Sequence, residues 1–124
     1  MSKDEHSHEF EPLHSDHGIA ESFITALRKM MPISSKGFFT HAIDDALLGF
    51  GITRGTLLIV DPEVPYENGK IVLVVFEKKY HIRKIYFHDD RIELRPANAK
   101  YESIYVDRSR VEIKGVVIHM QKKL

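Results

Sequence analysis

The stretch Gly49–Asp61 reads GFGITRGTLLIVD and joins a glycine-bracketed loop to an uninterrupted apolar run. Gly51 and Gly55 bracket the loop, and glycine readily adopts positive φ angles and allows close backbone approach. Leu57–Val60 then supplies four consecutive apolar residues, a pattern typical of a strand that is buried on both faces. This stretch therefore predicts a tight loop that leads directly into a central β-strand.

The segments around this stretch also have the composition of short β-strands. They are apolar and β-branched, and turn residues such as Pro62, Pro65, Asn68 and Gly69 separate them. The predicted strands are Phe38–Ala42, Thr56–Asp61, Lys70–Phe76, Lys79–Phe87, Arg91–Arg95, Ser103–Val106 and Val111–Met120. Because no helical pattern lies between them, we expect a mainly β fold, either a sheet assembly or a partly closed barrel.

Two of the connections have the composition of tight turns. Asn68-Gly69 is a pair that takes the positive φ angles of a two-residue turn. His88-Asp89-Asp90 separates two predicted strands and therefore indicates a hairpin loop.

One short helix is expected before the strands. Between Gly18 and Met31 the apolar residues recur at steps of three and four, which indicates one face of a helix. Pro32 ends the pattern, because the residue before a proline avoids helical geometry. The apolar face fits packing against the core of the domain, and docking on a partner is the alternative.

Residues 1–17 are polar and show no periodicity, so we expect a flexible arm followed by one β domain over residues 18–124. The spacing of the four histidines in this arm fits no standard metal site. We interpret them as part of a solvated tail. These histidines are His6, His8, His14 and His17.

The composition narrows the class of protein. The chain has 18 basic and 18 acidic residues, so its formal net charge is zero, which argues against a protein whose main work is coating nucleic acid. It has no cysteine, which excludes disulfides and thiolate metal sites. The longest apolar runs are far too short to cross a bilayer, and the polar N-terminus is no secretory signal. We expect a soluble cytoplasmic protein without a membrane partner.

Six blocks of sequence, in the same order, resemble the C-terminal domain of the LexA and UmuD family of serine–lysine self-cleaving proteins. The blocks are Phe23–Pro32, Gly51–Asp61, Gly69–Val72, Tyr80–Ile85, Leu94–Tyr101 and Gly115–Val117. The resemblance runs from about Ser22 to Met120 and implies the LexA/UmuD-like, signal-peptidase-like β fold. It is closer to UmuD than to LexA, because no helix-turn-helix domain precedes the β domain.

The two positions that match the catalytic pair of this family carry the wrong side chains. Where the family has its nucleophilic serine, this chain has Ala46, and where the family has its lysine base, this chain has Arg83. A methyl group offers no oxygen for attack on a peptide bond. A guanidinium loses its proton only above about pH 12 and therefore cannot act as a base at neutral pH. The resemblance thus implies a peptidase fold without its serine–lysine pair.

A different register would be needed to restore the reaction. Lys84 is the neighbouring amine, but successive side chains of a strand point to opposite faces, so it would face away from the site unless a bulge intervenes. Ser34 and Ser35 precede the first predicted strand, more than ten residues from the motif. An active peptidase in such a register remains the alternative hypothesis.

The residues beside the two catalytic positions are candidates for lining a cleft. By resemblance they are Asp44, Asp45, Leu47 and His81. With His41, the two aspartates could in principle collect a divalent ion. We favour a solvated loop in which aspartate caps backbone amides, so no metal and no cofactor is expected. An ion pair between Arg83 and Asp44 or Asp45 is the simplest use of that arginine.

The resemblance implies a catalytically inactive UmuD-like protein that acts in the SOS response as an accessory to translesion DNA synthesis. Its expected partners are proteins, namely a Y-family DNA polymerase and the recombinase filament, with a homodimer as the assembly. No direct sequence-specific binding of nucleic acid is expected. A peptide-binding β domain that takes an extended segment by strand addition is a further alternative.

Overall fold

The computed structural model describes residues 10–12 and 19–122, and it describes side chains from Thr25 onwards. The elements are β1 (Phe10–Pro12), α2 (Ile19–Met30), β2 (Phe38–His41), η1 (Leu48–Phe50), β3 (Leu57–Asp61), β4 (Ile71–Phe76), β5 (Lys79–His88), β6 (Arg91–Arg95), β7 (Ile104–Asp107), η2 (Arg108–Arg110) and β8 (Val111–Gln121). The seven strands and the helix that the sequence predicts are all present. No observed bound differs from the predicted one by more than one residue.

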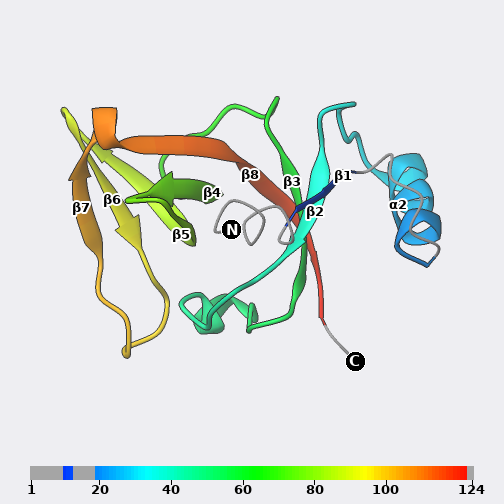
Figure 1. The fold of residues 1–124 in the computed structure, drawn as a ribbon, viewed down its shortest axis with the longest axis horizontal. Helices are drawn as coiled ribbons and strands as arrows, with labels where there is room; N and C mark the ends of the chain where they lie inside the picture. The colour runs from blue at the N-terminus through cyan, green and yellow to red at the C-terminus, as the bar shows by residue number, and fades with distance from the viewer. Residues whose placement is uncertain (1–9, 13–18, 123–124) are drawn as a thin grey trace.

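The strands form one coiled antiparallel sheet in the order β1-β2-β3-β8-β4-β5-β6-β7. Figure 1 shows two halves, one holding β1 to β3 and the other holding β4 to β7, with the long strand β8 running from one half to the other. The sheet is not closed into a barrel, since β1 and β7 are its edges. A mainly β fold with one short helix is therefore confirmed, as an open sheet assembly.

Strand β8 joins the two halves because it changes partner along its length. Its C-terminal part pairs with β3, and its N-terminal part pairs with β4. Gly115 lies at this transition, where a Cβ atom would be 2.7 Å from Cγ1 of Val60 and 3.0 Å from the backbone carbon of Asp61. The absence of a side chain at this position thus allows the two halves to come together.

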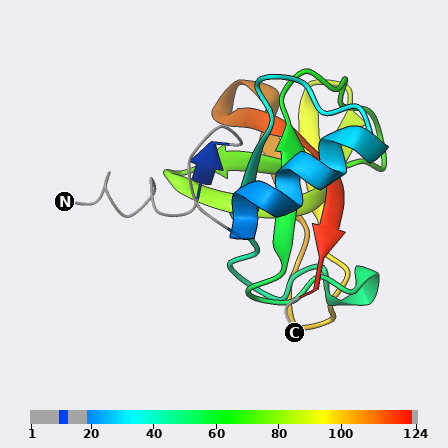
Figure 2. The same ribbon diagram turned by 90° about the vertical axis from the view of Figure 1, so that its right-hand side faces the viewer.

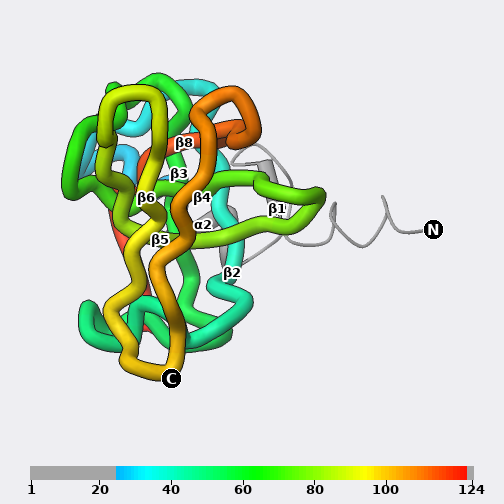
Figure 3. Tube along the Cα trace, turned by 90° about the vertical axis from the view of Figure 1, so that its left-hand side faces the viewer, coloured from blue at the N-terminus to red at the C-terminus, as the bar shows by residue number. Residues whose placement is uncertain are grey.

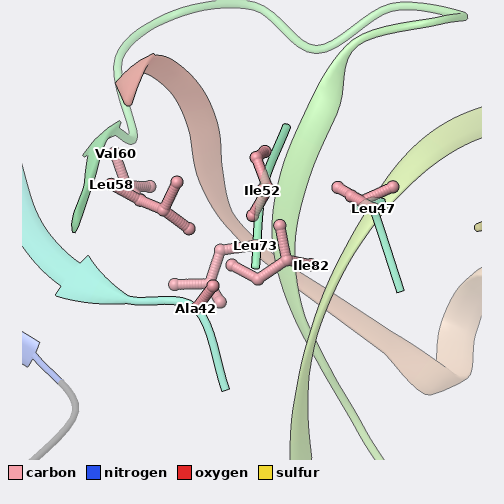
Figure 4. Close-up of a cluster of buried hydrophobic side chains, with 7 residues drawn as sticks. All are labelled: Ala42, Leu47, Ile52, Leu58, Val60, Leu73 and Ile82. Carbon is pink, nitrogen blue, oxygen red and sulfur yellow. The ribbon is translucent and has the colours of Figure 1, made fainter. Parts of the chain in front are cut away.

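The hydrophobic core has two main clusters, and strand β4 contributes to both. Leu73 packs into the first cluster (Figure 4), whereas its neighbours Val72 and Val74 pack into the second. Strand β3 is likewise buried on both faces, because Leu58 and Val60 enter the first cluster and Ile59 enters a third. The uninterrupted apolar composition of these two strands follows from burial on both sides.

Helix α2 packs on the outer side of β2 and β3 (Figure 2). Leu27 of the helix forms the third cluster with Phe39 and Ile59. This contact confirms the expected packing of the helix against the domain. Among the described residues, no helix is long and apolar enough to span a membrane.

The structure differs from expectation in the arm and in the turns. Phe10–Pro12, inside the predicted polar arm, forms strand β1 and pairs with β2. The rest of the arm, including His6, His8, His14 and His17, lies outside the described residues. In the predicted Asn68-Gly69 turn only Gly69 has a positive φ, 88°, and the Asn68 side chain instead accepts a hydrogen bond from the amide of Phe87.

The β4–β5 turn carries residues that no turn signal marked. Glu77 and Lys78 have φ angles of 52° and 65°, the two positive values of a type I′ hairpin turn. Asp89, in the predicted hairpin loop between β5 and β6, has a φ of 56°. Hairpin pairing of β4 with β5 therefore holds a Glu-Lys pair in a conformation that its residue types disfavour.

Candidate functional site

The loop between β2 and β3 carries Ala46, the residue that we expect by resemblance at the position of the serine nucleophile. Its two ends are tied together, because the amide of Ala42 donates to the carbonyl of Thr56 (2.9 Å) and the amide of Gly55 donates to the carbonyl of Ala42 (2.8 Å). Gly51 and Gly55 have φ angles of 81° and 93°, as the sequence predicts. The loop is therefore a closed, well-anchored unit.

Ala46 is held through both of its backbone groups. Its amide donates to Oδ1 of Asp44 (3.0 Å), and its carbonyl accepts a hydrogen bond from the amide of Ala97 (2.7 Å). The amide of Gly49 in turn donates to the carbonyl of Ala97 (2.8 Å). The residue is 0 % exposed, so its methyl group is enclosed by the protein.

The segment that follows β6 holds the same loop in place through Asp45. The amide of Asp45 donates to the hydroxyl of Tyr101 (3.2 Å), and its carbonyl accepts a hydrogen bond from Nδ2 of Asn98 (2.8 Å). The Asp45 carboxylate accepts a hydrogen bond from the amide of Arg54 (2.8 Å). Asp45 therefore fixes the loop and has no need of a metal ion to do so.

Arg83, which we expect by resemblance at the position of the lysine base, lies in the middle of β5 and is only 4 % exposed. Its Nη1 donates to the carbonyl of Ile82 (2.8 Å) and to Oδ2 of Asp44 (3.4 Å). Its Cζ lies 5.5 Å from the centre of the Tyr101 ring. The Nε atom is buried without a hydrogen-bond partner.

One carboxylate thus joins the two positions. Asp44 accepts from the Ala46 amide with one oxygen and from the Arg83 guanidinium with the other. The structure therefore brings Ala46 and Arg83 into one site, although 36 residues separate them in the sequence. In this site the groups present are a methyl, a buried cation and its counter-ion. The methyl of Ala46 and the guanidinium of Arg83 differ from the hydroxyl and the amine of a serine–lysine pair.

The sequence matches the Peptidase S24-like family over residues 10–118, which is most of the chain. The chain belongs to this family. It is also 34 % identical over 85 residues to the LexA repressor of Syntrophobacter fumaroxidans and 33 % identical over 89 residues to the LexA repressor of Moorella thermoacetica. These alignments cover 68 % and 72 % of this chain but 41 % and 42 % of the repressors. The chain thus spans less than half the length of these relatives.

The alternative hydroxyl and amine of this S24-like domain lie in other surroundings. Lys84 is paired with Arg95 and Ile71, on the side of β5 opposite to Arg83, and its Nζ lies 4.6 Å from the centre of the Phe50 ring. The Ser34 hydroxyl donates to Oδ1 of Asp61 (2.5 Å), at the end of β3. The described contacts therefore place Lys84 and Ser34 beside other groups rather than beside each other.

Leu47 and His81, two of the expected cleft residues, differ from each other in burial. Leu47, which we expect to line a cleft, is buried in the first core cluster. It follows Ala46 directly, and the loop turns it inward as an anchor. His81 is half-buried two residues before Arg83, and burial, followed by the positive charge of Arg83, lowers its pKa below the ordinary value.

The aspartates of the S24-like site use their oxygens within the protein. Asp44 contacts Arg83 and Ala46, Asp45 contacts the Arg54 amide, and His41 is exposed at the end of β2. Within the part of the chain that the structure describes, no three His, Asp or Glu side chains gather in a way that could hold a metal ion.

Tyr101 and Ala97 are site residues that sequence reasoning did not assign. Asn98 and Tyr101 belong to one of the blocks that resemble the family, but the resemblance assigned no contact to them. Their contacts with Asp45 cross 53 and 56 residues. A tyrosine three residues after an asparagine was the only signal available, and it does not say which loop the pair contacts.

Proposed function

We propose that this S24-like protein is a catalytically inactive, UmuD-like protein that acts by binding protein partners. The observation that carries the proposal is the carboxylate of Asp44 between the Ala46 amide and the Arg83 guanidinium. The peptidase reaction needs a hydroxyl that attacks and a neutral amine that takes its proton. Here the first is a methyl group and the second is a cation at every physiological pH.

The surroundings of Arg83 support the same conclusion. Burial can depress the pKa of a lysine until it becomes a base, but a guanidinium keeps its proton and needs a counter-ion. Asp44 provides that counter-ion, and the Tyr101 ring lies close to the guanidinium. The site is therefore suited to hold a loop together rather than to cleave a peptide.

The proposed role is that of an accessory protein in the SOS response and translesion DNA synthesis. It rests on the LexA relatives, on the resemblance to UmuD, and on a chain that keeps the family fold without the chemistry. The proposed partners are a Y-family DNA polymerase and the recombinase filament, and the proposed assembly is a homodimer in the cytoplasm. Leu48 and Phe50, which are apolar and exposed beside the site, fit contact with a protein.

A cleavage assay tests the lack of activity. The protein is incubated with recombinase, single-stranded DNA and nucleotide, and a LexA repressor in the same tube serves as the positive control. We expect the repressor to be cut while the mass of this protein stays unchanged. A discrete shortened product of this chain would overturn the proposal and support an active peptidase in another register.

A pull-down from the source cell tests the partner. We expect a Y-family polymerase to be recovered with the wild-type protein. Recovery of unrelated proteins only would argue against the accessory role while leaving the lack of peptidase activity intact, because the two experiments read different properties.

A further inference from the structure

One face of strands β5, β6 and β7 combines aromatic rings with basic side chains. Residues that lie directly opposite each other in antiparallel strands share a face. The pairs Lys84–Arg95, Tyr86–Glu93, His88–Arg91, Glu93–Tyr105 and Arg91–Asp107 therefore lie on one face, which we call the outer face. The opposite face carries the apolar side chains of the second core cluster. Figure 3 views the molecule from the end at which β6 and β7 lie.

The rings and the cations of the outer face are in direct contact. The guanidinium of Arg95 lies 3.8 Å from the centre of the Tyr86 ring, and the ammonium of Lys84 lies 4.6 Å from that of Phe50. The rings of His88 and Tyr105 lie 6.5 Å apart. On the outer face itself the cation–ring contact is that of Arg95 with Tyr86, since Phe50 belongs to η1.

The acid at the centre of this face is covered and neutralised. Glu93 is only 4 % exposed and accepts hydrogen bonds from Arg95 (2.8 and 3.0 Å) and from the hydroxyl of Ser103 (3.0 Å). Its Oε1 also lies 3.0 Å from Nε2 of His88. The outer face thus carries three cations, Lys84, Arg91 and Arg95, and two acids, the buried Glu93 and Asp107, which lies opposite Arg91 at one end.

We propose that the outer face binds single-stranded nucleic acid without sequence preference. Unpaired bases stack on aromatic rings and on guanidinium planes, while neighbouring cations contact the phosphates. Tyr105 is 57 % exposed and offers a ring for one base. Arg95, stacked on Tyr86, offers a second stacking surface one row away across β6. Lys84 and Arg91 flank these surfaces and suit the phosphates.

The zero net charge of the chain does not oppose this inference. It argues against a protein that coats nucleic acid with its whole surface, whereas the outer face is a local arrangement. A double helix suits this face less well, because its bases are stacked on each other and cannot reach the rings. This inference goes beyond the proposed function and does not depend on the absence of peptidase activity.

Fluorescence anisotropy with labelled 15-nucleotide oligo-dT and oligo-rU tests the proposal with the full chain. We expect binding at micromolar protein, with log K falling against log salt at a slope of about −1.4, since Lys84 and Arg91 contribute about 0.7 each. A duplex of equal length should bind at least about fivefold more weakly if stacking contributes. Comparison of the two oligomers shows whether DNA or RNA is preferred. Absence of binding at about 100 μM protein in about 25 mM salt would overturn the proposal.

Matched variants locate the site. Tyr105→Ala should weaken binding about tenfold, and Tyr105→Phe should retain it, because the stacking surface and not the hydroxyl is required. Tyr66→Ala is the control, since Tyr66 is 47 % exposed and stacks on Phe87 away from the outer face. Equal losses from Tyr105→Ala and Tyr66→Ala would contradict the assignment.

A second matched pair separates position from net charge. Lys84→Gln with Arg91→Gln should reduce the salt slope by about 1.4, because each cation accounts for about 0.7. Lys36→Gln with Lys114→Gln removes the same charge from elsewhere on the surface and should leave the slope nearly unchanged. Equal effects of the two double variants would show non-specific electrostatics and overturn the proposal. Thermal unfolding of each variant confirms that it is folded.

Discussion

The carboxylate of Asp44 and the guanidinium of Arg83 lie 3.4 Å apart, and the same carboxylate holds the amide of Ala46 at 3.0 Å. The arginine is buried, so its charge requires the aspartate, and the aspartate fixes the loop that carries Ala46. One ionic contact therefore joins β5 to the loop between β2 and β3.

Removal of the carboxylate should cost more stability than removal of the guanidinium. Asp44→Asn leaves a buried cation without its counter-ion and should lower the free energy of unfolding by about 2 kcal/mol. Arg83→Met removes the cation together with its unpartnered Nε and should stay within about 1 kcal/mol of wild type. Urea denaturation measures both. The exposed pair Lys36–Glu63 is the control, and Glu63→Gln should change stability by less than about 0.5 kcal/mol. A larger loss from Arg83→Met than from Asp44→Asn would contradict this account.

Gly115→Ala should destabilise the protein by about 1–3 kcal/mol, because the added methyl group meets Val60 and the backbone of Asp61 at the transition of β8. Chemical denaturation of this variant and of Val60→Ala provides the measurement. The double variant should lose less than the sum of the single losses, since Val60→Ala removes one of the clashing atoms. Additive losses would show that contact with the Val60 side chain is not the cause of the lost stability.

Lys78→Gly should stabilise the protein by about 0.5–1 kcal/mol. Lys78 has a φ of 65° at the second central position of the β4–β5 turn, where glycine has no steric cost. The thermal unfolding midpoint should rise. Lys79→Gly is the matched control and should lower the midpoint, because Lys79 is the first residue of β5 and glycine weakens a strand. A fall in the midpoint of both variants would show that the turn is not strained.

Stability should decrease between about pH 4.5 and pH 2 through Glu93. Hydrogen bonds from Arg95, followed by those of His88 and Ser103, outweigh burial and lower the pKa of Glu93 from 4.5 to about 2. A carboxyl group with a depressed folded-state pKa stabilises the fold above its unfolded-state value and loses that contribution as the pH falls through the folded-state value.

Glu93→Gln provides the comparison for this pH effect. The variant should be less stable than wild type at neutral pH, and the difference should shrink as the pH falls from 4.5 to 2. Urea midpoints measured at several pH values give the result. A constant difference between the two proteins over this range would mean that Glu93 does not titrate there.

Much of the architecture was predictable from local patterns. The apolar run of β3 indicated a strand buried on both faces, and its side chains indeed enter two clusters. The positive φ angles of Gly51 and Gly55 followed from their residue type. Strand β1 was missed because a three-residue strand is too short to show alternation and is stabilised by pairing with β2.

The sequence by itself determined the strands, the helix and the glycine-bracketed loop, because side-chain chemistry and periodicity are local properties. Only the tertiary structure decided that Asp44 links Ala46 and Arg83, that Asn98 and Tyr101 hold the same loop, and that Tyr86, Arg95 and Tyr105 share one face. Those contacts join residues that are far apart along the chain or lie on different strands. They depend on strand register and on the coiling of the sheet, which short stretches of sequence do not specify.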